Sequence, residues 1–356
     1  MTSGSEGSTP QTELNPFSHY QDRATQITLR HDARLISHSE IATFKRCRRK
    51  WWLAWYRGLR FARESPTGPR AIGDRVHRAL AQWYVPDGSA RTEPQAALES
   101  LIKADTEAVL VTFKDDEGLT GILLKMKKDD DLERAMVSGY VQWLEETGAD
   151  ADYEVLASER YEDAVMSGLT GRGGVPVYII AKLDAKVRRR SDGVLRYMDH
   201  KTVADFASKT MLLAIDEQML WYDLIEILTN TQLGERSGGA IYNMIRRVKR
   251  TAKANPPFYQ RQEILHNRLQ IESFYHQLYG TIQDVLQLEG RLDDGANHHQ
   301  VAYPTPNPNC TWDCDYRMVC PLFNDGSRVE DMLKNFYTAG DPLAYYYRDE
   351  VIKDDT

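Results

Sequence analysis

Long hydrophobic runs are missing from this 356-residue chain. No stretch reaches the roughly 18 apolar residues that a membrane-spanning helix needs, and the N-terminal stretch MTSGSEGSTPQTELNPFSHY lacks the apolar core of a signal peptide. We therefore expect a cytoplasmic protein with no membrane partner. Hydrophobic residues still make up 42% of the chain, which is enough to bury a sizeable core.

An excess of positive charge is also absent. The net charge of −7 excludes a protein that coats nucleic acid through its overall charge, so any nucleic-acid site has to be a local basic patch. KRCRRK at 45–50, KVRRR at 186–190 and IRRVKR at 245–250 are such patches, although each taken alone is more typical of a solvated charged face. The chain lacks the GxxxxGKS/T loop of ATPases, so a helicase motor would have to come from a partner chain.

Changes of pattern divide the chain into three parts. Residues 1–34 are rich in Ser, Thr, Gly and Gln without periodicity and predict a flexible leader. Residues 35–325 predict one folded domain, in which 88–148 form a helical insertion and 305–323 have little secondary structure of their own. Residues 326–356 predict a C-terminal helix and tail.

An amphipathic helix is predicted to open the folded domain. Ser37 and the glutamate three residues later have capping-box spacing, and apolar residues follow at steps of three and four. Cys47, Trp51 and Trp55 share the apolar face, which places the two tryptophans in the core. Trp52 and the neighbouring arginines and lysines remain as candidates for base stacking and phosphate contacts with DNA.

The hydrophobic period then changes from that of helices to that of strands. Helices are expected at about 72–84 and within 92–147, strands at 153–163, 175–190 and 194–202, a helix at about 209–230, a strand at 238–248 and a long helix at 262–289. This order predicts a mixed α/β core.

The last two of the three consecutive strands are predicted to form a hairpin that gathers charged residues. In the first of them, Ile179, Ala181, Leu183 and Ala185 are expected on a core face, with Lys182, Asp184 and Lys186 on the other. A turn at 192–193 places Asp184 opposite Lys201, and a turn at 191–192 places it opposite Asp199. Both registers put these three residues on one face, about 5–8 Å apart.

Two carboxylates at that separation can share a magnesium or manganese ion. Lys201 can then position or deprotonate a water, or stabilise charge on a phosphate. An ordinary surface hairpin with charge pairs is the alternative.

The order of motifs resembles that of the PD-(D/E)XK nuclease superfamily, and specifically of its RecB-like branch. A helical histidine in GDRVHRAL precedes an aspartate in AKLDAKV, the acid-x-Lys motif DHKT and the Gln-x-x-x-Tyr motif QMLWY. The resemblance implies a restriction-endonuclease-like core, in which helices flank a mixed sheet. The site residues that it implies are the metal ligands His77, Asp184, Asp199 and the backbone carbonyl of His200, the catalytic Lys201, and Gln218 and Tyr222, which support the site or contact DNA.

The chain has only 4 cysteines, Cys47, Cys310, Cys314 and Cys320. In a reducing cytoplasm four thiolates suit an iron–sulfur cluster or zinc, and four unrelated buried thiols are the alternative. The chain is similar here to RecB-like exonucleases of the AddB-like and CRISPR-associated kinds, whose four cysteines hold a 4Fe-4S cluster. The resemblance implies such a cluster, in preference to zinc, with 305–323 as the segment that clasps the domain.

The sequence thus predicts a metal-dependent DNA exonuclease that acts on single-stranded DNA or DNA ends in phage or CRISPR-type DNA processing. Helicase or CRISPR-adaptation proteins are candidate partners by analogy. One alternative is a non-catalytic DNA-binding or assembly subunit that keeps the fold and cluster as a scaffold, but the clustered carboxylates argue against it. Another is a zinc-clasped nucleic-acid-binding module without metal at the hairpin.

Overall fold

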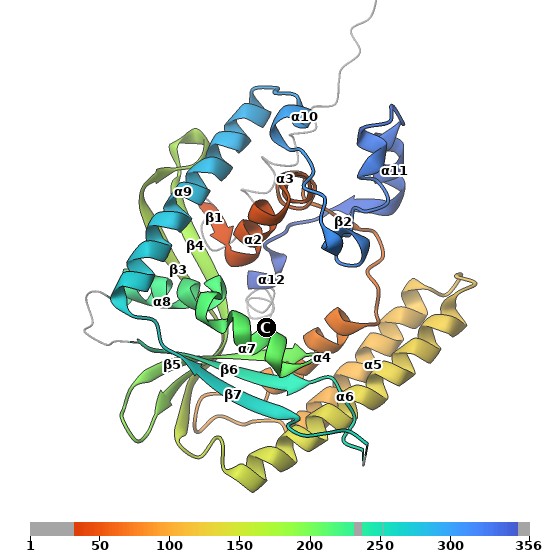
Figure 1. Ribbon diagram of the computed structural model, residues 1–356. Helices are drawn as coiled ribbons and strands as arrows, with labels where there is room; N and C mark the ends of the chain where they lie inside the picture. The colour runs from red at the N-terminus through yellow and green to blue at the C-terminus, as the bar shows by residue number, and fades with distance from the viewer. Residues whose placement is uncertain (1–31, 231–236, 252, 348–356) are drawn as a thin grey trace, which may run out of the picture.

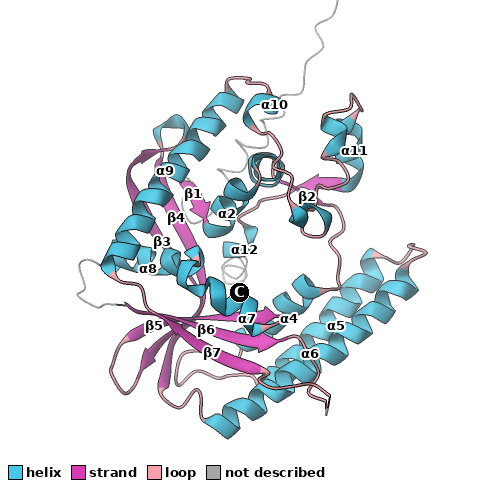
Figure 2. Cartoon of the chain, in the orientation of Figure 1, coloured by secondary structure: helices cyan, strands magenta, loops and turns pink. Residues whose placement is uncertain are grey.

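The computed structural model describes residues 32–230, 237–251 and 253–347 (Figure 1). Most of the predicted leader and the end of the predicted tail lie outside these ranges. Within them helices flank a mixed sheet, as the sequence predicts, with α9 along one side and α5 and α6 along the other (Figure 2). None of the described helices is long and apolar enough to cross a membrane.

The strands are β1 (Arg34–Ser37), β2 (Leu59–Phe61), β3 (Tyr153–Thr170), β4 (Pro176–Arg189), β5 (Leu195–Val203), β6 (Ser237–Arg246), β7 (Tyr259–Ile264) and β8 (Tyr337–Ala339). The helices are α2 (His38–Arg46), α3 (Arg48–Trp51), α4 (Pro69–Ala81), α5 (Pro94–Thr112), α6 (Leu119–Thr147), α7 (Phe206–Leu212), α8 (Glu217–Asn230), α9 (Arg268–Asp293), α10 (His298–Val301), α11 (Val329–Phe336) and α12 (Ala344–Tyr347).

Most of the long, strongly patterned elements agree with the sequence-based expectations, whereas short strands were missed. The single helix expected at about 209–230 is instead divided into α7 and α8, because Asp216 between them is extended. The three strands expected between 153 and 202 are confirmed as β3, β4 and β5, and the strand expected at 238–248 is confirmed as β6. The long helix expected from 262 begins only at Arg268, because residues 259–264 form β7 and pair antiparallel with β6. β1, β2 and β8 are three or four residues long, too short to show a period.

The sheet divides along one edge of β4. β3 pairs antiparallel with β4 along nearly its whole length. On the opposite edge, β5 pairs antiparallel with residues 185–188 and β1 pairs parallel with residues 177–180. Beyond β5 the sheet continues through β6, parallel to β5, and β7. Residues 181–184 of β4 therefore lie where the two neighbouring strands separate.

Each face of the sheet packs on its own hydrophobic core. Tyr242 and Met244 of β6 belong to a large cluster with residues of α2, α8 and α9. Ile241 and Ile245, the alternate residues of the same strand, belong to a second cluster with residues of α4, α5 and α6. The alternation along β6 accordingly positions α8 and α4, which carry predicted site residues, on opposite faces of the sheet.

A buried ion pair fixes α4 against α6. Arg75 and Glu133 are at most 1% exposed, and the Nε and Nη2 atoms of the guanidinium lie 2.9 and 2.8 Å from the carboxylate oxygens. Asp105 and Asp130 lie 3.5 and 3.6 Å from the same guanidinium. His77 lies on α4 two residues after Arg75. The ion pairs of Arg75 therefore also help to fix the position of His77 relative to the sheet.

Removal of one partner of this pair should destabilise the protein strongly. We expect Glu133→Ala to lower the free energy of unfolding by about 3–5 kcal/mol, because it leaves a buried guanidinium without its main partner. The matched control is Glu99→Ala on α5. It removes the exposed ion-pair partner of Arg134, the residue next to Glu133 on α6, and should lower the free energy of unfolding by at most about 1 kcal/mol. Urea denaturation followed by circular dichroism measures both losses. Equal small losses would show that the pair does not hold α4.

Candidate active site

Asp184 lies where the alternation of faces along β4 is interrupted. Ile179 and Leu183 pack in the cluster with α8 and α9, but Ala185 and Val187 pack in the cluster with α4. The expectation that Ala185 shares a core face with Ile179 and Leu183 is therefore wrong. The pairing partner of β4 changes from β1 to β5 over these residues, which accounts for the change of face.

The hairpin adopts the second of the two predicted registers. Ala185 pairs with Met198 and Lys186 with Tyr197, and the same register continued by one residue places Asp184 opposite Asp199. The amide of His200 donates a hydrogen bond of 2.7 Å to Oδ2 of Asp184. The two carboxylates are thus neighbours in the fold, and both are buried.

His77 reaches Asp184 from α4. Its Nδ1 atom lies 3.3 Å from Oδ2 of Asp184. Burial alone would lower the pKa of His77, but the charge of Asp184 and the hydrogen bond to it together raise that pKa above its ordinary value. In the same way, burial opposes ionisation of Asp184, yet His77 holds the pKa of that carboxyl well below its usual range.

Asp199 is surrounded by the other predicted site residues. Lys201 Nζ lies 2.8 Å from Oδ2, and Gln218 Nε2 donates to Oδ1 at 3.2 Å. Gln218 also donates to the hydroxyl of Tyr222 at 2.7 Å, and that hydroxyl donates to Oδ1 of Asp199 at 3.3 Å. Gln218 and Tyr222 thus both contact the Asp199 carboxylate directly. Burial raises the pKa of Asp199 and the charge of Asp184 raises it further, while Lys201 acts in the opposite direction.

The donor atoms at this site are those that a hard divalent cation prefers. Asp184 and Asp199 supply carboxylate oxygens, and their repulsion in a buried setting calls for a compensating cation. Both carboxylates are engaged by protein hydrogen-bond donors, and no three His, Cys, Asp or Glu side chains of the described residues lie in an arrangement that could hold a metal. The residues therefore fit a divalent cation in the type of their donor atoms. Binding of the cation would replace some of these hydrogen bonds with contacts to the metal.

Glu159 is a third carboxylate that sequence reasoning missed. Ser158 pairs with Ala185 and Arg160 with Leu183, so Glu159 lies opposite Asp184 in the register of β3 and β4. Its φ of 50° is the one positive value of a non-glycine residue in the described ranges. Burial and then the charge of Asp184 raise the pKa of Glu159, and Lys182 lies 3.0 Å from its carboxylate. The register of β3 shifts between Val155 and Ala157, and such a shift cannot be predicted from the alternation of residues, so no sequence pattern pointed to Glu159.

A polar row crosses the sheet behind the site. His200, Asn243 and Arg261 are register partners on β5, β6 and β7. Asn243 Nδ2 lies 2.8 Å from His200 Nδ1, and Arg261 Nε donates to Asn243 Oδ1 at 3.1 Å. Burial lowers the pKa of His200 to about 3, so its ring is neutral. The row thereby fixes the residue between Asp199 and Lys201.

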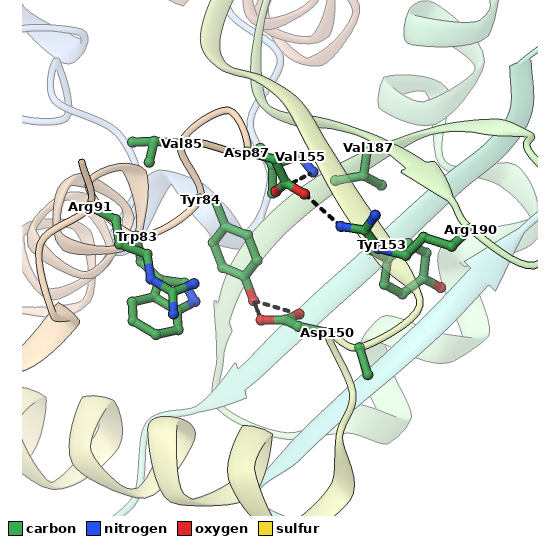
Figure 3. Close-up of a pocket in the computed structure, with 11 residues that line it drawn as sticks. Trp83, Tyr84, Val85, Asp87, Arg91, Asp150, Tyr153, Val155, Val187 and Arg190 are labelled. Carbon is green, nitrogen blue, oxygen red and sulfur yellow. Dashed lines mark hydrogen bonds and ion pairs between the residues drawn. The ribbon is translucent and has the colours of Figure 1, made fainter. Parts of the chain in front are cut away.

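A pocket of about 280 Å³ opens beside this row (Figure 3). Tyr84 points from its wall toward Asp150, to which its hydroxyl donates at 3.0 Å, and Asp87 pairs with Arg190 at 2.5 Å. The residues that line the pocket include none of the predicted catalytic residues. We therefore place the candidate active site at Asp184 and Asp199 and not in this pocket.

The structure brings the four cysteines together from the two ends of the domain. All are free thiols and half-buried. Burial raises the pKa values of Cys314 and Cys320, and nearby thiols raise them further: Cys310 and Cys320 act on Cys314, while Cys47 and Cys310 act on Cys320. The segment around the three C-terminal cysteines consists of short 3-10 turns, as its weak sequence pattern predicts.

Cys47 does not continue a helix, contrary to expectation. Ser37 caps α2 as predicted, but the helix ends at Arg46 because Cys47 is extended, with φ −162° and ψ 113°. The amide of Thr305 lies 3.4 Å from its sulfur, and the amide of Asn307 lies 3.5 Å from that of Cys310. Amide donors directed at sulfur are typical of thiolate-ligated clusters, so four gathered thiols fit such a group in donor chemistry. The bare thiols are not in a metal-holding arrangement.

The basic segment at 45–50 is engaged within the protein. Lys45 pairs with Glu217, Arg46 with Asp313, and Arg49 is buried, with its Nε donating to Ala302. Trp51 is in the core, as expected.

The expectation that Trp52 faces DNA is wrong. The residue is 7% exposed and its ring stacks on His298 with 4.7 Å between ring centres. A π-helical turn over Trp52–Tyr56 follows α3 and turns this tryptophan inward, a change of period that the apolar spacing did not reveal.

The His77–Asp184 pair should make stability depend on pH in metal-free protein. Because the folded pKa of His77 is raised, its protonation contributes stability that is fully present below about pH 6.5 and lost as pH rises through the folded value. We expect the difference in unfolding free energy between wild type and His77→Gln, measured by urea denaturation with chelator, to shrink between about pH 6 and about pH 9. In an Asp184→Asn background this pH dependence should vanish, and a difference that grows with pH would contradict the pairing.

Comparison with known families gives a match that covers most of the chain. Residues 35–321 match the model of the PD-(D/E)XK nuclease superfamily. A comparison with curated proteins found no match. The matched range contains the site residues from His77 to Tyr222, together with the four cysteines, and its mixed sheet flanked by helices is consistent with the nuclease fold. The chain belongs to the PD-(D/E)XK nuclease superfamily.

Proposed function

We propose that this protein is a metal-dependent DNA exonuclease that hydrolyses phosphodiester bonds in single-stranded DNA or at DNA ends. The observation that carries the proposal is the pair of buried, neighbouring carboxylates, Asp184 and Asp199, with Lys201 bonded to one of them. A merely structural hairpin gains nothing from two like charges in a desolvated position. The RecB-like resemblance supports the preference for DNA ends, and phage or CRISPR-type DNA processing is its setting by analogy.

Lys201 is proposed to stabilise charge rather than to act as a base. Burial would lower its pKa, but the charges of Asp199 and Asp184 raise that pKa above its ordinary value. The ammonium group therefore stays protonated near neutral pH and can donate to a phosphate oxygen as negative charge develops there. Gln218 and Tyr222 keep the Asp199 carboxylate in place for this contact.

His77, Asp184, Asp199 and the carbonyl of His200 would hold magnesium or manganese. When bound, such an ion neutralises the carboxylates and polarises a water and a phosphate oxygen. The contribution of the chain is to present these oxygens in a buried place whose backbone is fixed by the row from His200 to Arg261.

We propose further that the four cysteines hold a 4Fe-4S cluster. Its support is the gathering of free thiols from positions 47 and 310–320, with backbone amides directed at two of the sulfurs. Such a cluster would close a loop of more than half the chain, so its binding should stabilise the folded domain.

The nuclease proposal is tested by loss of cleavage in Asp199→Asn and Lys201→Met. With magnesium or manganese we expect both to lose at least about a hundredfold in rate. Asp199→Asn removes a carboxylate proposed to hold the metal, and Lys201→Met removes the positive charge proposed to stabilise the phosphate. Asp192→Asn changes a carboxylate in the turn of the same hairpin and should retain wild-type activity. The substrates are single-stranded and duplex DNA labelled at either end, and a closed single-stranded circle.

The substrates separate the possible outcomes. Release of label from linear DNA, with the circle left intact, is the expected result. Cutting of the closed circle would show that the protein is an endonuclease and would contradict the proposed exonuclease activity. Inactivity of wild type toward every substrate, in protein that retains its fold, would favour the scaffold role.

The cluster proposal is tested by metal analysis of anaerobically purified protein. We expect a brown protein that contains iron and acid-labile sulfide, and loss of both, with much of the soluble protein, in Cys314→Ala. Met318→Leu alters an exposed residue between Cys314 and Cys320 and should keep the iron. A colourless wild-type protein loaded with zinc would contradict the assignment.

A further inference from the structure

The C-terminal helix α12 lies at the end of the sheet where β1 joins β4 (Figure 1). Leu343, just before the helix, is buried and packs with Leu35 of β1 and Ile180 of β4. The hydroxyl of Tyr346 lies 3.4 Å from that of Ser39 on α2. These contacts hold α12 beside residues 181–184, the part of β4 that carries Asp184.

Tyr345 of α12 is an aromatic residue beside the carboxylates of the candidate active site. Lys182 Nζ lies 5.0 Å from the centre of its ring and 3.0 Å from the carboxylate of Glu159. Burial and then the charges of Glu159 and Asp184 raise the pKa of Tyr345, so its hydroxyl is neutral. The residue is nevertheless 45% exposed, which leaves much of its surface free for a ligand.

The charged groups around Tyr345 determine which chemical groups of a ligand can pack on its ring. The carboxylates of Glu159, Asp184 and Asp199 all act on Tyr345. Each of them already pairs with a cation, namely Lys182, His77 and Lys201, so a phosphate group gains no net attraction there without a further cation. An uncharged, planar nucleobase is not repelled, and it gains from stacking on an aromatic ring. A base within a duplex already stacks on its neighbours, so only an unpaired base is available for this contact.

We propose that Tyr345 is a stacking platform for an unpaired nucleobase of the strand that occupies the active site. This inference rests on the proposed nuclease function and deepens it, because it names the structural source of a preference for single-stranded DNA. Tyr345 lies beyond residues 35–321, which the superfamily model matches, so the family does not assign this role. The role belongs to the segment that follows the cysteines.

The experiment measures binding of a single-stranded oligonucleotide that contains 2-aminopurine to full-length protein carrying Asp199→Asn. Adding Tyr345→Ala should weaken binding by roughly 5- to 150-fold and relieve quenching of the fluorescent base. Tyr345→Phe keeps the ring and should bind within about twofold of the Asp199→Asn protein. Phe336→Ala removes another exposed aromatic residue of the C-terminal segment and should leave binding unchanged.

The outcomes separate this inference from the nuclease proposal. Binding that is equally tight with and without the Tyr345 ring would overturn the stacking role while leaving the nuclease proposal intact. An equal loss for duplex and single-stranded DNA would also overturn it, since the platform requires an unpaired base. If protein with Tyr345 intact bound no DNA of either kind, both proposals would fail. The unfolding midpoint of each variant shows that a loss of binding is not a loss of fold.

Discussion

The repulsion between two buried carboxylates is the constraint around which the candidate site is built. Asp184 and Asp199 are neighbours in a place where water cannot screen them. Each is therefore met by its own donors. His77 and the His200 amide lie on Asp184, whereas Lys201 and Gln218 lie on Asp199. The positive and hydrogen-bond-donating groups of the protein partly offset the repulsion between the two carboxylates, and a bound divalent cation would offset the rest.

The separation of β1 and β5 along one edge of β4 explains why the two carboxylates lie at this place in the sheet. β5 leaves β4 at Ala185 and β1 takes its place only at Ile180, so a short length of β4 is released from pairing on that edge. Side chains from α4 on one face and α8 on the other can both reach this gap. The row from His200 to Arg261 then supplies the rigidity that the missing strand pairs do not.

The sequence predicted those parts of the site that lie on long, regular elements. His77, Asp199 and Gln218 sit on α4, β5 and α8, whose periods are clear, and the structure gathers them as the motif order implies. Other features escaped because tertiary contacts decide them. The extended backbone of Cys47 breaks a helix that the apolar spacing would continue, and the place of Glu159 depends on a strand register that shifts.

The cysteines and the active site are connected through the C-terminal segment. Tyr316, between Cys314 and Cys320, donates its hydroxyl to Leu59 of β2 at 2.6 Å, and its ring stacks on Tyr337 of β8. β8 pairs with β2 and leads directly into α12, which brings Tyr345 to the carboxylates. A group bound by the four thiols would therefore fix the strand that positions α12. If the four cysteines hold such a group, it would stabilise the domain and, through one continuous segment, also determine how a ligand approaches the candidate site.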